Sequence, residues 1–262
     1  MDVVREEREG AVIVTFNRPQ KLNAVNLEMR AVLTGAVDDL RDRSDLRLLL
    51  IKSTGPYFTA GIDISGQRVD QPPDVNRSSF VDYRRDYRRP LHLLFDEMEE
   101  IEKPVVVAIQ GVCLGVGVEM SGSADFRLAS ANARFGLPEI DIGVIAGSGG
   151  TSRFTRLCGI GWSKWLNMAG EQIDAQTAMI AGFVQAIYPA ESFEDEVWAF
   201  CKRVMSRPAD VQGASKTAIE LSYDLDRNSA RRVERLTNTS LVLRDRRPLI
   251  EKVMDRSKRN KT

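Results

Sequence analysis

The run GVCLGVGVEM (111–120), which follows the β-branched stretch PVVVAI (104–109), decides the fold class of this chain. PVVVAI is typical of a buried strand, and a helix is predicted to begin near Gly115 and to run through Met120. A strand, a glycine-rich turn and a helix together form the unit from which α/β proteins are built. Glu119 lies near the end of the run, so a carboxylate is expected beside the turn.

The same alternation of strand and helix extends along the chain on both sides. Strands are predicted at AVIVTF (11–16), LRLLLIKS (46–53) and ADFRLAS (124–130), and helices at 27–40 and 91–101. The polar segment 65–90 contains Pro72-Pro73 and is predicted to form a loop or mobile lid, followed by a helix from about Phe80. This order of elements favours an α/β fold.

The strand signals stop at about residue 190. Segments 192–206, 208–224 and 228–256 are charged and carry helical periodicity. We therefore predict a core domain over 1–195 and a helical region over 196–262.

The composition excludes several classes of protein. The 262 residues carry 37 basic and 37 acidic side chains, so the formal net charge of zero gives no global attraction to nucleic acid or to an anionic membrane. No apolar run approaches the roughly 20 residues of a membrane span. The charged N-terminus MDVVREEREG is no secretory signal. A cytoplasmic protein is expected.

Histidine and cysteine are too scarce for several common catalytic sites. Cys113, Cys158 and Cys201 are scattered, which fits neither a disulfide framework nor a zinc site. His92 is the single histidine, so a Ser-His-Asp triad and a histidine-rich metal site are not expected, and no metal is predicted. Any acid–base chemistry is therefore expected to use carboxylates.

Two glycine-rich turns are candidates for binding a developing negative charge. Gly61 in FTAGIDI (58–64) lets a ligand approach the main chain closely, and LGVGVE (114–119) opens a helix whose first N–H groups have no internal partner. Two such N–H groups from separate segments would form an oxyanion hole, worth about 3–4 kcal/mol of barrier per donor. The alternative is that both turns only form tight corners. The second run does not match the dinucleotide-binding pattern GxGxxG.

Glu139, in FGLPEIDIG (135–143), is a second carboxylate beside a glycine and a proline. Two carboxylates near one substrate can take opposite roles, because each raises the pKa of the other and burial raises both. The alternative is a pair of surface or salt-bridged glutamates. Their spacing in sequence does not decide whether Glu119 and Glu139 meet.

Several motifs in register resemble the crotonase family of enoyl-CoA hydratases and isomerases. They are NRPQKLNAVN (17–26), FTAGIDI, GVCLGVGVEM with the following ADF, FGLPEIDIGVIAGSGGTSRFTRLCG (135–159) and IDAQTAMIAGFVQAIYP (173–189). The resemblance covers about residues 5–190 closely. It implies an α/β spiral of ββα units with a C-terminal helical region that packs trimers, and hence a homotrimer or a dimer of trimers.

The resemblance also assigns binding residues. The oxyanion hole would use the backbone N–H groups of Ile62 and Val116. Many members have glycine at the second position, so the valine side chain here would crowd the acyl chain or tilt the turn. Contacts to coenzyme A are implied for Ala24, Ala60, Asp63 and Ile64. Many hydratases have lysine where Ser65 stands, which puts one coenzyme A contact in doubt.

The catalytic residues implied by the resemblance are Glu119 and Glu139. Glu119 would deprotonate the water that attacks Cβ, and Glu139 would hold that water and relay a proton to Cα. Hydration of a 2-enoyl-CoA is therefore expected, with coenzyme A as part of the substrate and no further cofactor. A Δ3,Δ2-enoyl-CoA isomerase, which can work with one carboxylate, and a non-catalytic acyl-CoA-binding protein stay open as alternatives.

Other charged residues are given weaker assignments. Asp141 is either a third acid or a loop cap, and Gly147 stands about where dienoyl-CoA isomerases carry an aspartate. The arginines of 84–89 either attract the phosphates of coenzyme A or form a solvated helix face, which is favoured because Asp82 and Asp86 balance them. Some relatives bind RNA, but the zero net charge argues against it here.

Overall fold

A computed structural model of the chain describes residues 1–65 and 90–259. Its contacts divide the chain into two compact units, Met1–Ser206 and Arg207–Thr262. The predicted helix from about Phe80, the arginines at 84–89 and nearly all of the predicted lid lie outside the described residues. The domain boundary predicted at residue 195 falls within the last helix of the first unit.

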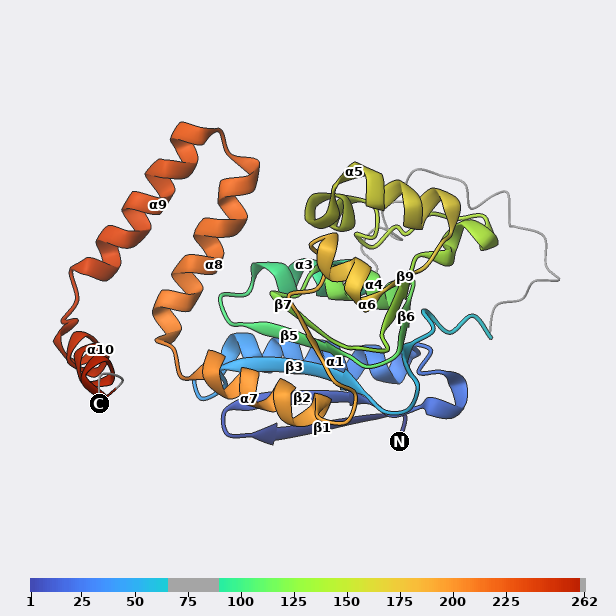
Figure 1. Ribbon diagram of the computed structural model, residues 1–262, viewed down its shortest axis with the longest axis horizontal. Helices are drawn as coiled ribbons and strands as arrows, with labels where there is room; N and C mark the ends of the chain where they lie inside the picture. Colours follow the sequence, from blue (N-terminus) through green and yellow to red (C-terminus); the bar gives the residue numbers. More distant parts are fainter. Residues whose placement is uncertain (66–89, 260–262) are drawn as a thin grey trace. The chain divides into compact units, whose positions relative to one another are not determined.

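The first unit alternates short strands with helices along the chain (Figure 1). Its strands are β1 (Val3–Arg8), β2 (Ala11–Phe16), β3 (Leu48–Ser53), β4 (Tyr57–Thr59), β5 (Val105–Ile109), β6 (Val112–Leu114), β7 (Phe126–Ser130), β8 (Arg134–Gly136), β9 (Ile173–Asp174) and β10 (Ala186–Tyr188). Its α-helices are α1 (Leu27–Asp42), α3 (Pro90–Glu100), α4 (Val116–Gly122), α5 (Ser152–Ala169), α6 (Ala175–Ile180) and α7 (Phe193–Met205). Two 3₁₀ turns are η1 (Pro19–Lys21) and η3 (Pro138–Ile142).

The strands form two sheets. The larger has the order β1-β2-β3-β5-β7-β10, and all of its pairs are parallel except β1–β2. The smaller has the order β4-β6-β8-β9, in which β4, β6 and β8 run parallel and β9 is antiparallel. Each of β3, β5 and β7 is followed within a few residues by a strand of the smaller sheet, so the strands from β3 to β8 alternate between the two sheets.

The central strands of the larger sheet are buried on both faces, whereas β1 at the edge is exposed beyond Val3. Successive side chains of a strand point to opposite sides of the sheet. On one face Val12, Val14, Leu49 and Ile51 join the core that includes α1 and α3. On the other face the alternate residues of the same strands pack against α7, which lies along the sheet in Figure 1. Phe193, Val197, Cys201 and Val204 of α7 recur at helical spacing and supply that packing. A parallel sheet covered on both sides explains the continuous apolar runs of β3 and β5.

The second unit is helical. It contains α8 (Ala209–Asp224), α9 (Arg227–Val242) and α10 (Arg247–Arg259), and α8 contacts α9. The side chain of Asp226 caps α9 by accepting from the N–H groups of Asn228 and Ser229. Across the described ranges of both units, no helix combines the length and the apolar character that crossing a membrane requires.

The predicted elements are largely confirmed. The strands predicted at 11–16, 46–53, 104–109 and 124–130 correspond to β2, β3, β5 and β7, and the helix predicted near Gly115 is α4. The predicted helical segment 228–256 is instead two helices, because α9 ends at Val242 and Pro248 stands in the first turn of α10. The two- and three-residue strands of the smaller sheet were not predicted.

Candidate active site

The candidate site forms where three parallel strands of the smaller sheet end. β4, β6 and β8 lie side by side and point the same way, so the segments that follow them emerge at one edge. Those segments carry Ile62, Val116 and Glu139 respectively. Ligands of α/β proteins commonly bind at the carboxyl ends of parallel strands. Three of the residues singled out from the sequence are thus brought to one edge by the sheet itself.

The turns after β4 and β6 touch each other. Gly115 has a φ of +56° and Gly61 a φ of +104°, both in the region that favours glycine. A Cβ built on Gly115 would lie 3.6 Å from the Cα of Gly61. A Cβ at residue 115 would thus be in ordinary van der Waals contact with Gly61, and the positive φ is what favours glycine at both positions.

The N–H of Ile62 faces away from its neighbouring strand segment. Ile62 forms an isolated parallel bridge with Val25, in which the Gly61 carbonyl accepts from the Val25 N–H at 2.8 Å and the Asp63 N–H donates to the Val25 carbonyl at 3.0 Å. Because successive backbone groups of an extended segment point in opposite directions, the Ile62 N–H points to the other side. Among the described residues it has no acceptor.

The N–H of Val116 is available for a different reason. Val116 is the first residue of α4, and the first N–H groups of a helix have no intrahelical acceptor. The partial positive charge at a helix N-terminus adds to its attraction for an anion. Two donors from separate turns therefore lie at the edge where β4 and β6 end, which is the arrangement that an oxyanion hole needs.

Glu119 is one helical turn after Val116 and is almost fully buried, with 5 % of its surface exposed. Its Oε1 accepts hydrogen bonds from the N–H groups of Ser148 at 2.6 Å and Gly150 at 3.4 Å. Burial raises the pKa of Glu119 to about 7, and the nearby Glu139 adds to this rise, while the two N–H groups oppose it. The side chain can therefore gain or lose a proton near neutral pH.

Glu139 lies in η3, and its carboxylate reaches back to the turn after β6. A Cβ built on Gly115 would lie 2.9 Å from Glu139 Oε1. Oε2 is buried and receives no hydrogen bond from the described residues. Burial accordingly raises the pKa of Glu139 above its ordinary value. Glu139 also raises the pKa of Glu119 through its charge, so the two carboxyl groups, 20 positions apart in the sequence, lie near each other.

The residues assigned to coenzyme A lie on two segments that Arg18 joins. The Arg18 guanidinium donates to Asp63 Oδ2 at 2.6 Å and to the Ala24 carbonyl at 3.2 Å, and it pairs with Asp2 at 3.0 Å. Ala60 is linked to the same loop, because its N–H donates to the Leu22 carbonyl at 2.9 Å. The side chain of Asp63 is therefore engaged within the protein.

The side chain of Asn23 anchors the same loop through hydrogen bonds. It is fully buried at 0 % exposure, and its amide donates to the carbonyls of Thr54 and Tyr57, at 2.7 Å each. Its Oδ1 accepts from the N–H of Arg18 at 2.7 Å. Ile64 is exposed, and Ser65 donates its N–H to Asp63 at 2.9 Å. Sequence reasoning quoted the motif that contains Arg18 and Asn23 but assigned neither a role.

Ser148 and Gly150 were also missed as functional positions. Their signal was the glycine-rich IAGSGG (145–150), which was compared with other members only for an aspartate that it lacks. Its backbone, not a side chain, contacts the site through Glu119. A sequence shows the glycines that permit such a loop but not the carboxylate that the loop binds.

Asp141, Cys113 and His92 are the remaining candidates. Asp141 is exposed, and a Cβ built on Gly170 would lie 4.0 Å from its Oδ1. Cys113 is buried, and burial raises the pKa of its thiol, which opposes formation of a reactive thiolate. His92 lines a pocket with Asp96, Glu99 and Arg153, and Ser148 lines the same pocket. The described residues contain no cluster of three or more His, Cys, Asp or Glu that could hold a metal ion.

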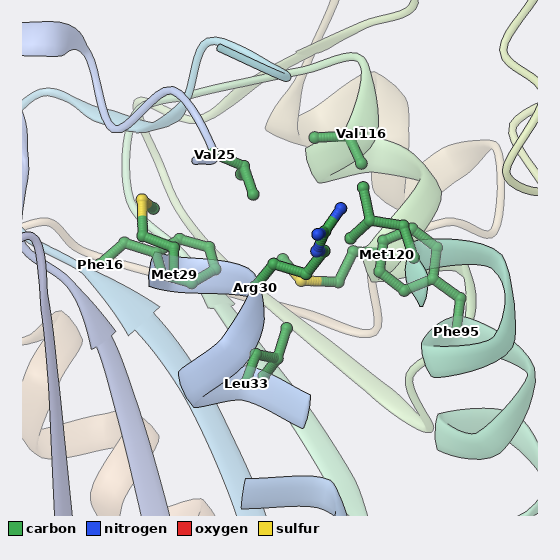
Figure 2. Close-up of a pocket in the computed structure, with 9 residues that line it drawn as sticks. Phe16, Val25, Met29, Arg30, Leu33, Phe95, Val116 and Met120 are labelled. Carbon is green, nitrogen blue, oxygen red and sulfur yellow. The ribbon is translucent and has the colours of Figure 1, made fainter. Parts of the chain in front are cut away.

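A mostly apolar pocket adjoins the turn at Val116. Its cavity volume is about 10 Å³, roughly the space of one water molecule. Figure 2 shows most of the residues that line it, which are Phe16, Val25, Met29, Arg30, Leu33, Leu91, Phe95, Val116 and Met120. The Val116 side chain is 7 % exposed and forms part of this wall. The N–H of Val116 therefore lies at the start of α4, and its isopropyl group closes one side of this small pocket.

Known proteins resemble this chain over most of its length. Residues 6–247 match the family described as enoyl-CoA hydratase/isomerase. The crotonyl-CoA hydratase of Syntrophomonas wolfei is 32% identical over 229 residues, which cover 86% of this chain and 85% of that protein. The short-chain-enoyl-CoA hydratase of Clostridium acetobutylicum is 30% identical over 226 residues, which cover 86% and 83%.

Solved structures share the fold. An enoyl-CoA hydratase from Thermoplasma volcanium has a TM-score of 0.80 at 31% identity, with 94% of both chains covered. An enoyl-CoA hydratase from Bacillus anthracis has a TM-score of 0.86 at 24% identity, over 98% of this chain and 97% of the other. The match to the family, the two relatives and the fold together show that this chain belongs to the enoyl-CoA hydratase/isomerase family, with the crotonase fold.

Proposed function

We propose that this protein is an enoyl-CoA hydratase, which adds water across the 2,3 double bond of a 2-enoyl-CoA. The observation that carries the proposal is that two carboxyl groups of raised pKa, the buried Glu119 and the half-buried Glu139, lie near two available N–H groups at one sheet edge. The names of the relatives, a crotonyl-CoA hydratase and a short-chain-enoyl-CoA hydratase, agree with it.

The proposed reaction uses each of these groups once. The thioester oxygen accepts from the N–H groups of Ile62 and Val116, which stabilise the charge that develops there. Glu119 takes a proton from water as the water oxygen bonds to C3. The electrons of the double bond move into the thioester to form an enolate, and Glu139 then gives a proton to C2. After the reaction Glu119 holds the proton taken from water, and Glu139 lacks the proton given to C2. Transfer of one proton from Glu119 to Glu139 restores the starting state.

The raised pKa values suit this exchange. Near neutral pH Glu119, with a pKa of about 7, is present in both its ionised and its protonated form, and burial favours a proton on Glu139 as well. One member is then a base and the other an acid, as hydration requires. In an exposed pair, both groups would be ionised and neither could donate.

The coenzyme A portion of the substrate is proposed to lie on the joined segments that carry Ala24, Ala60, Asp63 and Ile64. The Arg18 contacts hold these segments in place before the substrate binds, which lowers the entropy cost of binding. Because coenzyme A arrives with the substrate, the proposed reaction needs no further cofactor.

We also propose that the chain works as a homotrimer or a dimer of trimers. Large apolar side chains are exposed on α5 and α6, among them Ile160, Trp165, Met168, Met179 and Ile180. Contiguous apolar surface commonly marks an interface. Light scattering on the purified protein tests this directly, and a monomeric mass would contradict it.

Turnover of crotonyl-CoA tests the proposed function. Purified protein should consume the enoyl thioester absorbance and form the 3-hydroxyacyl-CoA, and Glu139→Gln should lower kcat about a hundredfold or more. A Δ3,Δ2-isomerase that uses Glu139 would largely survive Glu119→Ala, whereas the hydratase would not. If acyl-CoA binds by calorimetry but no enoyl-CoA in a panel of chain lengths is converted, the protein is a binding protein and the proposal fails.

A further inference from the structure

Arg153 is a largely buried arginine that no step of the proposed reaction uses. It is the second residue of α5, and 13 % of its side-chain surface is exposed. Its guanidinium pairs with two acids of α3: Nη2 binds the carboxylate of Asp96, and Nε donates to Glu99 Oε2 at 2.9 Å. Two carboxylates that bind different nitrogens of one planar group hold that group in a single orientation.

The same side chain holds the glycine-rich turn 147–150. Arg153 Nη1 donates to the Ser148 carbonyl at 3.3 Å, and the Arg153 N–H donates to the Gly149 carbonyl at 2.8 Å. A Cβ built on Gly149 would lie 2.5 Å from Nη1 and 3.1 Å from Cδ of Arg153. The arginine side chain therefore lies directly against this turn, in the space that a side chain of residue 149 would need.

The turn in its place binds Glu119. The Ser148 N–H donates to the Glu119 carboxylate at 2.6 Å, and a Cβ built on Gly150 would lie 3.1 Å from Glu119 Cγ. Ser148 thus stands between two side chains, because its carbonyl accepts from Arg153 and its N–H donates to Glu119. A shift of the Ser148 backbone would disturb both hydrogen bonds. An unbroken series of contacts therefore leads from α3 through Arg153 and Ser148 to Glu119.

Arg153 also acts on Glu119 through its charge. It lowers the pKa of Glu119, against the larger effect of burial and the effect of Glu139, which both raise it. Four further ionisable side chains line the pocket beside Arg153, which are His92, Asp96, Glu99 and Arg156. Because a base must be ionised before it accepts a proton, a cation near Glu119 extends the activity of this base to lower pH.

We infer that Arg153 is a positioning residue for the proposed base: it holds the turn 147–150 against Glu119 and places a positive charge near this carboxylate. The inference rests on the proposed function. The planar, five-donor guanidinium binds two acids and a carbonyl at once, whereas lysine would supply the charge without that geometry. The two contributions, position and charge, can therefore be separated by substitution.

The dependence of turnover on pH measures the two contributions. The acid limb of kcat/KM for crotonyl-CoA should reflect Glu119, whose pKa is about 7. Arg153→Met should lower kcat about tenfold or more, because the turn is no longer held. It should also move the acid limb to higher pH by about 0.5 or more, because the charge is lost. Arg153→Lys should lower kcat as well but leave the acid limb in place.

Arg41→Met is the matched control. Arg41 pairs with Glu97 of α3, the helix that also holds Arg153, and with Asp38 and Asp42 of its own helix. Its ion pairs do not involve the turn 147–150, so its removal should change neither kcat nor the acid limb. The inference is overturned if Arg153→Met leaves either kcat or the acid limb as it is in the unaltered protein.

A second background distinguishes a positioning role from general support of the fold. Glu119→Gln lacks the base already, so Arg153→Met should lower its residual rate by less than about twofold. A loss in this background as large as the loss in the unaltered protein would overturn the inference, because Arg153 would then act on something other than Glu119. Should Arg153→Met fail to fold, Arg153→Lys in the same two backgrounds gives this comparison.

Titration of Glu119 itself distinguishes failure of the inference from failure of the proposed function. If the unaltered protein hydrates no enoyl-CoA, the hydratase proposal fails, and carboxyl ¹³C NMR of the full chain replaces the rates. The Glu119 signal is assigned by its loss in Glu119→Gln. Its pKa should rise in Arg153→Met and stay unchanged in Arg153→Lys. An unchanged pKa in Arg153→Met would overturn the inference.

Discussion

Glu139 and Gly115 are in direct contact: the carboxylate oxygen Oε1 of Glu139 occupies the space where a side chain of residue 115 would begin. A Cβ built on Gly115 would be 2.9 Å from that oxygen, closer than a Cβ contact allows. The absence of a side chain at Gly115 therefore leaves room for the carboxylate of Glu139. Because Gly115 also precedes Val116, the carboxylate of the proposed acid lies beside the residue whose N–H is the proposed oxyanion donor.

Gly115→Ala should therefore inactivate the protein while leaving its fold intact. The new methyl group would displace Glu139, and a misplacement of about 1 Å costs roughly a hundredfold in rate. Gly143→Ala is the matched control, since Gly143 also has a positive φ of +75° but has nothing within 4 Å of a built Cβ. Both variants should lose some stability to backbone strain. Equal activities of the two variants would contradict the role of the contact.

Glu119→Gln should change how stability depends on pH. Burial raises the pKa of Glu119 from 4.5 to about 7, so the folded state holds a proton that the unfolded state releases. This contribution is fully present below pH 4.5 and is lost as pH rises through 7, an effect of at most about 3 kcal/mol. Urea unfolding should show the unaltered protein losing stability relative to Glu119→Gln between pH 5 and pH 8. A constant difference would mean that the pKa is not raised.

Val116→Ala should widen the range of acyl groups. The substitution keeps the backbone N–H and removes two methyl groups from the pocket wall. The ratio of kcat/KM for 2-octenoyl-CoA to that for crotonyl-CoA should rise by about tenfold, which is the scale of a methylene in an apolar pocket. Val118→Ala is the control, because Val118 is buried in the same helix and does not line the pocket. An unchanged ratio would remove Val116 from the acyl site.

Arg18→Met should weaken substrate binding without changing the chemical step. It removes the bonds to Asp63 and to the Ala24 carbonyl that join the two proposed coenzyme A segments. KM should rise by about tenfold while kcat changes little, since the carboxylate pair is not touched. Arg5→Met removes exposed ion pairs to Glu7 and Asp39 and should change neither constant. A fall in kcat alone would place Arg18 in the chemistry.

The long elements could be predicted from sequence because they contain enough residues to show a pattern. β2 and β3 are continuous apolar runs, and α1 repeats its buried residues at helical spacing. β6, β8 and β9 have two or three residues each, too few to show a period, although β6 and β8 are the strands that deliver Val116 and Glu139.

The individual residues of the candidate site could be named from the sequence, but their proximity could not. The motifs located Glu119, Glu139, Ile62 and Val116, but their meeting depends on the order of strands in the smaller sheet, which no local pattern contains.

The hydrogen bonds from Ser148 and Gly150 to Glu119 make the two oxygens of its carboxylate differ in their hydrogen bonding. Both N–H groups donate to Oε1. A proton that reaches this carboxyl group is therefore expected on Oε2, because the lone pairs of Oε1 already accept the two hydrogen bonds from the loop. The loop therefore determines which oxygen atom of the proposed base receives the proton, and so the direction from which a proton can arrive.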